Sequence, residues 1–153
     1  YTHKLFNLDN SNGLSDILAG KISAADAIKS VKDAGFHYIS RGVVPPNPAE
    51  LLMHRRLDEL LTWASKNYDL VILDTPPILA VTDAAIIGNY VGTTLLVARF
   101  EQNTVKEIEV SAKRFEQSGV VIKGCILNGV IKKASSYYGY GYNHYGYSYT
   151  EDK

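Results

Sequence analysis

Short apolar runs alternate with helical repeats along the chain from Phe36 onward. Each run has the length of a single strand and is nearly continuous in apolar residues. Strands of this kind that alternate with helices are typical of a parallel sheet that is covered on both faces. We therefore predict an α/β fold with a mostly parallel sheet between helices. The predicted strands are Phe36–Ser40, Asp69–Leu73, Thr93–Ala98 and Val120–Leu127.

One long helix is predicted to begin at Asn47. Asn47 is expected to cap it, with Pro48 in the first turn, where a missing backbone N–H costs nothing. Glu50 is placed to reach back to the cap. Apolar residues then recur at helical spacing, which predicts one buried stripe. The stripe consists of Met53, Leu57, Leu60, Leu61 and Ala64.

Another helix is predicted to begin at Thr104, which forms a capping box with Glu107. This helix is expected to stop at Ser118-Gly119, since glycine favours the left-handed conformation that ends helices. Two further helices are indicated by similar signals. They are Asp83–Tyr90, with Asp83 as its expected N-cap, and a helix capped by Ser23 that ends near Gly35.

Composition narrows the class of protein. A length of 153 residues fits one domain with a real core, and the formal net charge of zero argues against a nucleic-acid backbone binder. Cys125 is the single cysteine, so no disulfide framework exists and we expect an inert core residue. No apolar run is long enough to predict a membrane span, and no signal peptide is recognised. The helix charges Arg55, Arg56, Lys113 and Arg114 are expected to face solvent.

The end of the chain has a composition of its own. Between residues 137 and 149, tyrosines alternate mainly with glycine, and this spacing does not bury aromatic rings. We therefore divide the chain into a folded part, residues 1–133, and a flexible tail, residues 134–153. The exposed phenols are either an adhesive aromatic ribbon or a row of phosphate acceptors. The tail tyrosines are Tyr137, Tyr138, Tyr140, Tyr142, Tyr145, Tyr147 and Tyr149.

Asp74 is the sharpest candidate for chemistry inside the folded part. It ends an apolar run and is followed by Thr75-Pro76-Pro77, a turn that the prolines fix. In open α/β sheets, ligands bind at the carboxyl ends of strands, where an acid can hold Mg²⁺ and orient a nucleotide phosphate. The alternative is a turn aspartate that bonds its own backbone. The chain contains no GxxxxGK[ST] phosphate loop, so a phosphate cradle is expected upstream of residue 1.

Four motifs in this order resemble the cytoplasmic kinase domain of bacterial tyrosine autokinases, the BY-kinases of the Wzc and Etk type. The family is related to deviant P-loop ATPases of the MinD and ParA group, so the resemblance implies a fold that is incomplete at the N-terminus. It would lack the Walker A and A′ motifs and be inactive alone. The motifs are Tyr1–Leu5, Gly42–Leu52, Leu73–Pro77 and the tyrosine-rich tail.

The resemblance assigns roles to individual residues. Asp74 matches the Walker B aspartate, which is catalytic and positions Mg²⁺ for ATP. Asn128 lies where related ATPases place an asparagine against the adenine base, although a turn residue beside Gly129 is an equal alternative. Tyr1 resembles an internal regulatory tyrosine whose phosphate would need a cationic partner. Arg41 is our candidate for that partner, with a plain surface charge as the alternative.

The resemblance also implies partners and a location. The tail tyrosines would be phosphorylated in trans by a neighbouring subunit of a ring-like homo-oligomer. Seven phosphates would add roughly −10 to −14 charges, which would loosen the ring. A cognate phosphatase and the capsule or exopolysaccharide export machinery would be partners, with no nucleic acid. The location would be the cytoplasmic face of the bacterial inner membrane.

Two other functions remain open from the sequence. A partition or cell-division ATPase would use the same sheet and the same Walker B acid, but it would not need the tyrosine tail. A non-catalytic module would use the tail to stack on RNA, single-stranded DNA or sugars. The zero net charge and the absence of arginine from the tail count against this module.

Overall fold

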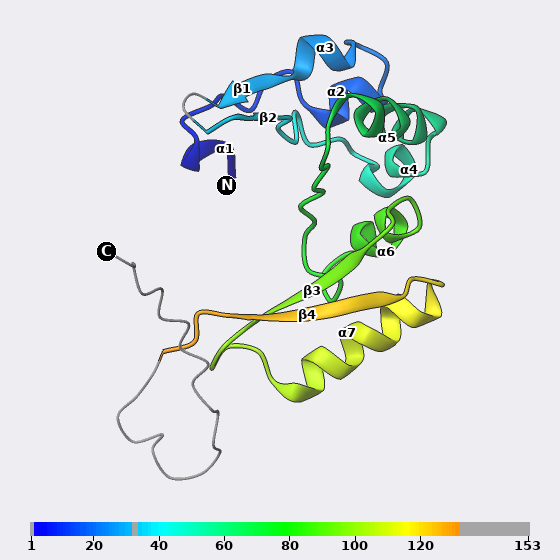
Figure 1. Ribbon diagram of the computed structural model, residues 1–153. Helices are drawn as coiled ribbons and strands as arrows, with labels where there is room; N and C mark the ends of the chain where they lie inside the picture. The colour runs from blue at the N-terminus through cyan, green and yellow to red at the C-terminus, as the bar shows by residue number, and fades with distance from the viewer. Residues whose placement is uncertain (1, 32–33, 132–153) are drawn as a thin grey trace, which may run out of the picture.

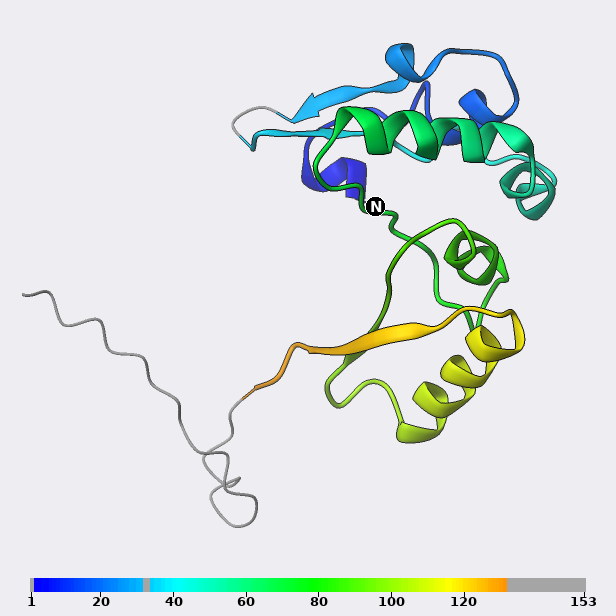
Figure 2. The same ribbon diagram turned by 45° about the vertical axis from the view of Figure 1, so that its right-hand side comes forward.

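The computed structural model describes residues 2–31 and 34–131 of the chain. Figures 1 and 2 show two regions with an extended segment between them. We call residues 2–67 the N-terminal region, residues 68–82 the connecting segment and residues 83–131 the C-terminal region. Among the described helices, none is both long enough and apolar enough to cross a membrane. The proposed tail, residues 134–153, lies outside the described residues.

Helices and one short hairpin form the N-terminal region. The hairpin pairs β1 with β2 in antiparallel register, with Ser30 opposite His37. The helix capped by Ser23 is therefore shorter than predicted, because the residues after it pair as a strand. The Ser23 capping box itself is confirmed, with a hydroxyl that accepts from Asp26 N at 3.3 Å. The elements are α1 (Thr2–Leu5), α2 (Leu14–Leu18), α3 (Ala24–Ala27), β1 (Lys29–Val31), β2 (Phe36–Tyr38), α4 (Pro48–Leu52) and α5 (Arg55–Asn67).

The helix predicted from Asn47 is interrupted. It is divided into α4 and α5 at Met53 and His54, and the His54 ring accepts a hydrogen bond from Arg56 N at 3.2 Å. Met53 is exposed, so its place in the buried stripe was wrong. The Asn47 side chain does not cap the backbone but donates to the Glu50 carboxylate instead. The 3.6-residue period continues through this break, so periodicity alone did not reveal it.

Two apolar cores hold the N-terminal region together. In one, Leu57 of α5 is completely buried and packs with Leu18 of α2 and Leu52 of α4. Ile87 belongs to the same core although it lies in α6, in the C-terminal region. The other core includes Ile17, Ala27 and Leu60. Because the first core takes residues from both regions, α6 attaches the C-terminal region to the N-terminal one.

A parallel pair of strands and two helices form the C-terminal region. β3 and β4 pair in parallel, with Leu96 opposite Cys125. Leu96 and Ile122 pack against a buried cluster that includes Phe115 of α7, so α7 covers one face of the pair, as Figure 2 shows. The Thr104–Glu107 capping box that opens α7 is confirmed. The elements are α6 (Asp83–Gly88), β3 (Thr94–Arg99), α7 (Val105–Gln117) and β4 (Ile122–Asn128), and Thr82 rather than Asp83 is the N-cap of α6.

The opposite face of the β3–β4 pair is uncovered. Leu95 is 53% exposed and Val97 is 60% exposed, and both alternate with residues that face α7. On β4, Ile126 lies opposite Val97 and is also exposed. Cys125, which lies opposite Leu96 on the side of α7, is exposed as well, so the prediction of a core cysteine was wrong. An apolar strand sequence predicts two buried faces, but in the described residues the second face has no covering layer.

The connecting segment runs extended but forms no strand within the described chain. The prediction of a buried strand at Asp69–Leu73 was therefore wrong, because Leu70 is 75% exposed and Ile72 is 80% exposed. A buried strand needs neighbours on both edges, and β3 and β4 pair with each other only. Leu73 and Ile78 still anchor the segment, the first in the core around Leu57 and the second against α7.

Two arginines that were predicted to face solvent hold backbone carbonyls instead. Arg114 of α7 donates to Ile78 O at 2.9 Å and to Leu79 O at 3.1 Å, which fixes the end of the connecting segment. Arg56 of α5 donates to Leu18 O at 3.1 Å, at the end of α2. Amphipathic periodicity places both residues on the polar side of their helices, but it does not show which carbonyls lie nearby.

Candidate functional site

Asp74 lies next to the beginning of α1, 72 residues away in the sequence. The Thr2 hydroxyl donates to Asp74 Oδ2 at 3.3 Å, and the carboxylate is exposed. Pro77 follows in a turn in which Ala80 N donates to Pro77 O at 2.9 Å. The Asp74 side chain does not bond its own backbone in this turn. The geometry therefore differs from that of a turn aspartate and leaves the carboxylate available to a ligand.

Tyr38, at the end of β2, is a further neighbour of Asp74. Burial raises the pKa of the Tyr38 phenol, and the Asp74 carboxylate raises it further because a nearby negative charge disfavours the phenolate. A hydrogen bond with the Thr2 side chain opposes this rise. Its ring also packs edge-on against Phe6, with centroids 5.8 Å apart. Three separate segments thus meet around the Asp74 carboxylate.

Arg41 lies three residues after Tyr38, beyond the end of β2. Partial burial lowers the pKa of His3, and the positive charges of Lys4, Arg41 and Lys29 lower it further. The Arg41 side chain is exposed and forms no ion pair with any described residue. An unpaired guanidinium at this position is suited to receive an anionic group.

Close backbone contact with α2 fixes the position of Arg41. Ser15 N donates to Arg41 O at 2.9 Å, and the Asn10 side chain donates to Gly42 O at 3.0 Å. Gly42 has φ +82°, and a Cβ there would lie 2.7 Å from the Asp16 carboxylate. Only glycine permits both the left-handed conformation and this approach. The local signal in the sequence is Gly42 itself, which suggests a tight turn but not its partner.

Asn128 is the last residue of β4, at the carboxyl end of the parallel pair. Its side-chain oxygen accepts from Gly129 N at 2.8 Å, the bond expected of a turn asparagine. Among the described residues, no hydrogen bond joins Asn128 to Asp74 or Arg41. The structure therefore places Asp74 beside Thr2 of α1 and Asn128 at the end of β4 in the C-terminal region.

Asp74 fits a magnesium nucleotide better than it fits a metal ion held by protein alone. No group of three or more His, Cys, Asp or Glu side chains that could hold a metal lies within residues 2–31 and 34–131. Mg²⁺ in nucleotide sites is bound through one or two carboxylates together with phosphate oxygens and water. A single exposed carboxylate satisfies that requirement. Two cavities of the described chain, of about 260 and 540 Å³, are not lined by Asp74.

The remaining predicted site residues lie outside the described residues. These are Tyr1 and the tail tyrosines Tyr137, Tyr138, Tyr140, Tyr142, Tyr145, Tyr147 and Tyr149. Sequence reasoning missed Thr2 and Tyr38 beside Asp74. Thr2 and Tyr38 lie close to Tyr1 and Arg41 in the sequence, which was the available signal. No residue pattern indicated that either side chain lies beside the carboxylate.

Comparison with known proteins gives a consistent result. No protein-family model matches the chain. The tyrosine-protein kinase Wzc of Salmonella typhi is 57% identical over 152 residues, which cover 99% of this chain and 21% of that protein. The tyrosine-protein kinase Etk of Escherichia coli K12 is 60% identical over 140 residues, which cover 92% of this chain and 19% of that protein. The chain thus spans about a fifth of the length of these curated relatives.

A solved structure agrees with the sequence relatives. The kinase domain of Escherichia coli tyrosine kinase Etk matches with a TM-score of 0.85 and 58% sequence identity, over 94% of this chain and 56% of that chain. The match confirms the predicted α/β, P-loop NTPase-like fold class. It extends over both regions of the chain and the connecting segment between them. The chain therefore belongs to the bacterial tyrosine-protein kinases of the Wzc and Etk type, and it corresponds to part of their kinase domain.

Proposed function

We propose that this chain is part of an ATP-dependent protein-tyrosine autokinase and supplies its Walker B acid together with its own phosphate acceptors. The observation that carries the proposal is the Asp74 carboxylate, which is exposed and held beside Thr2 at the end of an apolar segment. The relatives named above are tyrosine-protein kinases, and they match this chain across the segment that contains Asp74.

Asp74 would act by holding Mg²⁺ against the nucleotide phosphates. When bound, the metal ion neutralises charge on the phosphate oxygens as the phosphoryl group moves from ATP to a tyrosine oxygen and ADP leaves. Asp74 would orient the ion, and its carboxylate is an acceptor for the phenol proton. Phosphoryl transfer depends mainly on such positioning and on charge stabilisation. The exposed side of Asp74 is therefore the side on which we place the nucleotide.

The phosphate cradle is assigned to the remainder of the kinase domain. This sequence contains no GxxxxGK[ST] loop, and it spans 56% of the solved Etk kinase domain. The uncovered residues Leu70, Ile72, Leu95 and Val97 support the assignment, since apolar strands are normally enclosed by neighbours and by layers on both faces. We propose that the Walker A and A′ motifs lie in that remainder and that this chain alone is inactive.

An Asp74→Asn substitution in the intact protein tests the catalytic assignment. The amide keeps the shape of the side chain but removes the charge, so we expect autophosphorylation with ATP and Mg²⁺ to fall by about 100-fold or more. Asp69→Asn is the matched control, because Asp69 is an exposed acid on the same segment and should retain activity. Phosphotyrosine in the C-terminal peptide is the readout. Equal activity of both variants would refute the role of Asp74.

The tail tyrosines are proposed as substrates in trans within a ring-like homo-oligomer. Glycine between the tyrosines allows an extended strand of chain to enter a neighbouring subunit. Phosphorylation of all seven would add roughly −10 to −14 charges, and repulsion between subunits would loosen the ring. Mass measurement of oligomers, with phosphorylated samples compared with tail Tyr→Phe samples, tests this. Equal assembly would refute it.

Arg41 is proposed as the receptor of a phosphate on Tyr1. Its guanidinium has no ion-pair partner among the described residues, and its charge contributes to the lowered pKa of His3, two residues after Tyr1. A phosphate brings about −1.5 to −2 charges and accepts two parallel hydrogen bonds from a guanidinium. We expect this contact to change kinase activity by moving the start of α1 relative to Asp74. Removal of the guanidinium by Arg41→Ala should abolish the dependence of activity on Tyr1 phosphorylation.

Asn128 remains our candidate for the adenine base. It occupies the carboxyl end of a parallel strand, where ligands bind in such sheets. Its oxygen is used by Gly129 N, so the amide NH₂ group is the part that would meet the base. Asn128→Ala should raise the KM for ATP more than it lowers kcat. An unchanged KM would leave Asn128 with its turn function alone.

In the cell we propose that the protein regulates capsule or exopolysaccharide polymerisation and export from the cytoplasmic face of the inner membrane. A cognate phosphatase would reverse the reaction, and the polysaccharide export machinery would receive the signal. Formation of phosphotyrosine in the tail separates this function from that of a partition-type ATPase, which hydrolyses ATP without it. Binding of RNA, single-stranded DNA or sugar without phosphorylation would instead favour an aromatic interaction module.

A further inference from the structure

Arg114 of α7 binds the turn that follows Asp74. Its Nη1 atom donates to Ile78 O at 2.9 Å and to Leu79 O at 3.1 Å, so one guanidinium nitrogen bridges two consecutive carbonyls. Arg114 forms no ion pair with any described residue. Its positive charge therefore faces backbone oxygens of the turn and not a carboxylate.

The turn that Arg114 binds is also held by apolar packing and by its own backbone. Ile78 is 7% exposed and belongs to the buried cluster beneath α7. Ala80 N donates to Pro77 O at 2.9 Å, and Val81 N donates to the same oxygen at 3.2 Å. The turn is thus a small ordered unit, and both its side chain and its carbonyls attach it to α7.

Few free backbone torsions separate this turn from Asp74. Pro76 and Pro77 each have a fixed φ, and the residue before a proline is restricted as well, which limits Thr75. On the other side of Asp74, Leu73 packs against the core that joins the two regions. The position of the Asp74 carboxylate therefore depends on where the turn after it is held.

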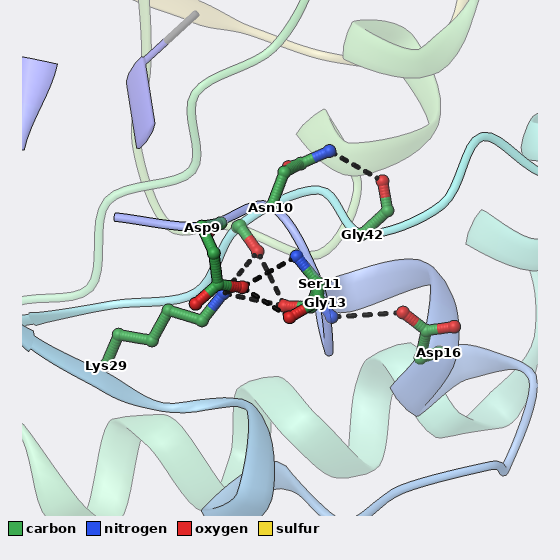
Figure 3. A network of polar contacts seen from close by, with 8 residues as sticks. Asp9, Asn10, Ser11, Gly13, Asp16, Lys29 and Gly42 are labelled. Carbon is green, nitrogen blue, oxygen red and sulfur yellow. Dashed lines mark hydrogen bonds and ion pairs between the residues drawn. The ribbon is translucent and has the colours of Figure 1, made fainter. Parts of the chain in front are cut away.

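A second cation in the chain binds backbone carbonyls in the same manner. The Lys29 ammonium donates to Asp9 O at 2.8 Å and to Ser11 O at 2.6 Å, as Figure 3 shows. Lys29 also forms an ion pair with the Asp9 carboxylate at 2.9 Å. The loop that Lys29 binds contains none of the candidate site residues, whereas the turn that Arg114 binds directly follows Asp74. Arg114 is therefore the cation whose carbonyl contacts bear on the candidate active site.

We propose that Arg114 is a positioning residue for Asp74. The proposal rests on the proposed function, in which Asp74 orients Mg²⁺ against the nucleotide phosphates, and it adds a residue of α7 to that site. With both carbonyls bound, the turn holds the Asp74 backbone at one position before Mg²⁺ and nucleotide bind. Without the guanidinium the two carbonyls lose their donor, and the turn must be ordered when Mg²⁺ binds. Loss of the guanidinium therefore raises the Mg²⁺ requirement more than it lowers the rate at saturating Mg²⁺.

An Arg114→Met substitution in the intact protein tests the proposal. Methionine keeps a long unbranched side chain with good helix propensity, but it removes the charge and the donors. Lys113→Met is the matched control, because Lys113 is the neighbouring exposed cation on α7. Autophosphorylation is measured at saturating ATP over a series of free Mg²⁺ concentrations. We expect the half-saturating Mg²⁺ concentration to rise by about threefold or more in Arg114→Met and to keep its wild-type value in Lys113→Met.

A conservative substitution and amide hydrogen exchange separate positioning from a general loss of structure. Arg114→Lys keeps the charge but replaces the planar guanidinium by an ammonium, so its Mg²⁺ requirement should lie between those of the wild type and Arg114→Met. The two amides that donate to Pro77 O should exchange faster in Arg114→Met without nucleotide and at the wild-type rate in the control. Faster exchange with an unchanged Mg²⁺ requirement would overturn the proposal, because the contact would then be purely structural. Unchanged exchange would overturn it as well.

Failure of the proposal is distinguishable from failure of the proposed function. Wild-type autophosphorylation by Asp74→Asn would refute the catalytic assignment of Asp74, and with it the role of Arg114. Loss of activity in Asp74→Asn together with a wild-type Mg²⁺ requirement in Arg114→Met would refute the role of Arg114 alone. If Arg114→Met does not fold, Arg114→Lys takes its place, with the same expected direction and a smaller factor. An unchanged Mg²⁺ requirement in that variant would then refute the proposal.

Discussion

The N-terminal and C-terminal regions of this chain are stabilised in different ways. In the N-terminal region both strands have three residues, and polar contacts between distant segments, such as those of Lys29, supplement the two apolar cores. In the C-terminal region the strands have six and seven residues, yet one face of β3 and β4 is uncovered. The N-terminal region therefore buries apolar residues in two cores, whereas the C-terminal region exposes an apolar surface that folded domains usually bury.

The two regions also differ in what they carry: candidate site residues lie against the N-terminal region, and the uncovered apolar face belongs to the C-terminal region. The candidate residues Asp74 and Arg41 lie against the N-terminal region, where backbone contacts fix their positions. The apolar face around Leu95 and Val97 belongs to the C-terminal region and holds no predicted site residue except Asn128 at its end. A region with polar contacts between distant segments is suited to holding charged groups at defined positions.

The largest expected effect is a loss of stability, and it is found by comparing one leucine from each region. Leu57→Ala removes a completely buried side chain from the core that joins both regions, and we expect a loss of about 2–5 kcal/mol of stability. Leu95→Ala in the intact protein should cost more than the roughly 0.5 kcal/mol expected at an exposed site, because we propose that the remainder of the kinase domain covers this face. Urea-dependent amide exchange of α5 and β3 measures both. A large loss from Leu95→Ala would show that the face is covered in the intact protein.

A smaller effect is expected from the backbone contact that supports Arg41. Gly42 has φ +82° and Gly35 has φ +67°, so alanine is strained at both positions, but only at Gly42 would its Cβ meet other atoms. We expect Gly42→Ala to be worse than Gly35→Ala by about 1–3 kcal/mol because of this overpacking. Thermal unfolding of the intact protein compares the two variants. Equal losses would mean that the approach of Gly42 to α2 is not tight.

The smallest effect concerns the start of α7 in the C-terminal region. Thr104→Ala should cost about 1 kcal/mol, because the hydroxyl accepts from Glu107 N at 3.2 Å. The backbone hydrogen bond from Thr104 lowers the pKa of Glu107 below its ordinary value of 4.5. A carboxyl whose pKa is lowered by folding stabilises the protein above its unfolded pKa, and this stabilisation is lost as the pH falls through the folded pKa.

A pH series checks the contribution of Glu107 to this cap. The destabilisation caused by Glu107→Gln should be complete above about pH 5 and should shrink as the pH falls below 4.5. Amide exchange at the first turn of α7 is the measurement, and Glu109→Gln is the control because Glu109 forms only a 3.6 Å ion pair with Lys106. A difference that is constant with pH would contradict the carboxylate role.

Much of the C-terminal region was predictable from the sequence because its signals are local. The Thr104 capping box and the apolar runs around β3 and β4 gave elements within one or two residues of those observed. Burial was predicted less well, as Cys125 and Leu70 show, because an apolar residue is buried only if another element covers it. That requirement concerns the surroundings of a strand and not its own pattern.

In the candidate site, too, residues with local signals were predicted and contacts between distant segments were not. Asp74 was recognisable because it ends an apolar run before two prolines, and Arg41 because it precedes Gly42. Thr2 and Tyr38 were missed, since their contact with Asp74 depends on how three segments fold together. Asn128 was identified with two possible roles, and its hydrogen bond to Gly129 N shows the turn role directly.

The sequence by itself determined the alternation of helices and strands, the acid at position 74, the tyrosines of the tail and the family to which they point. Spacing, capping and turn residues act over a few positions, so a linear pattern records them. Only the tertiary structure decided that Lys29 joins the loop after α1 to Ser40, and that Thr2 meets Asp74. Such contacts depend on distances between segments that are 11 to 72 residues apart, and no local pattern fixes those distances.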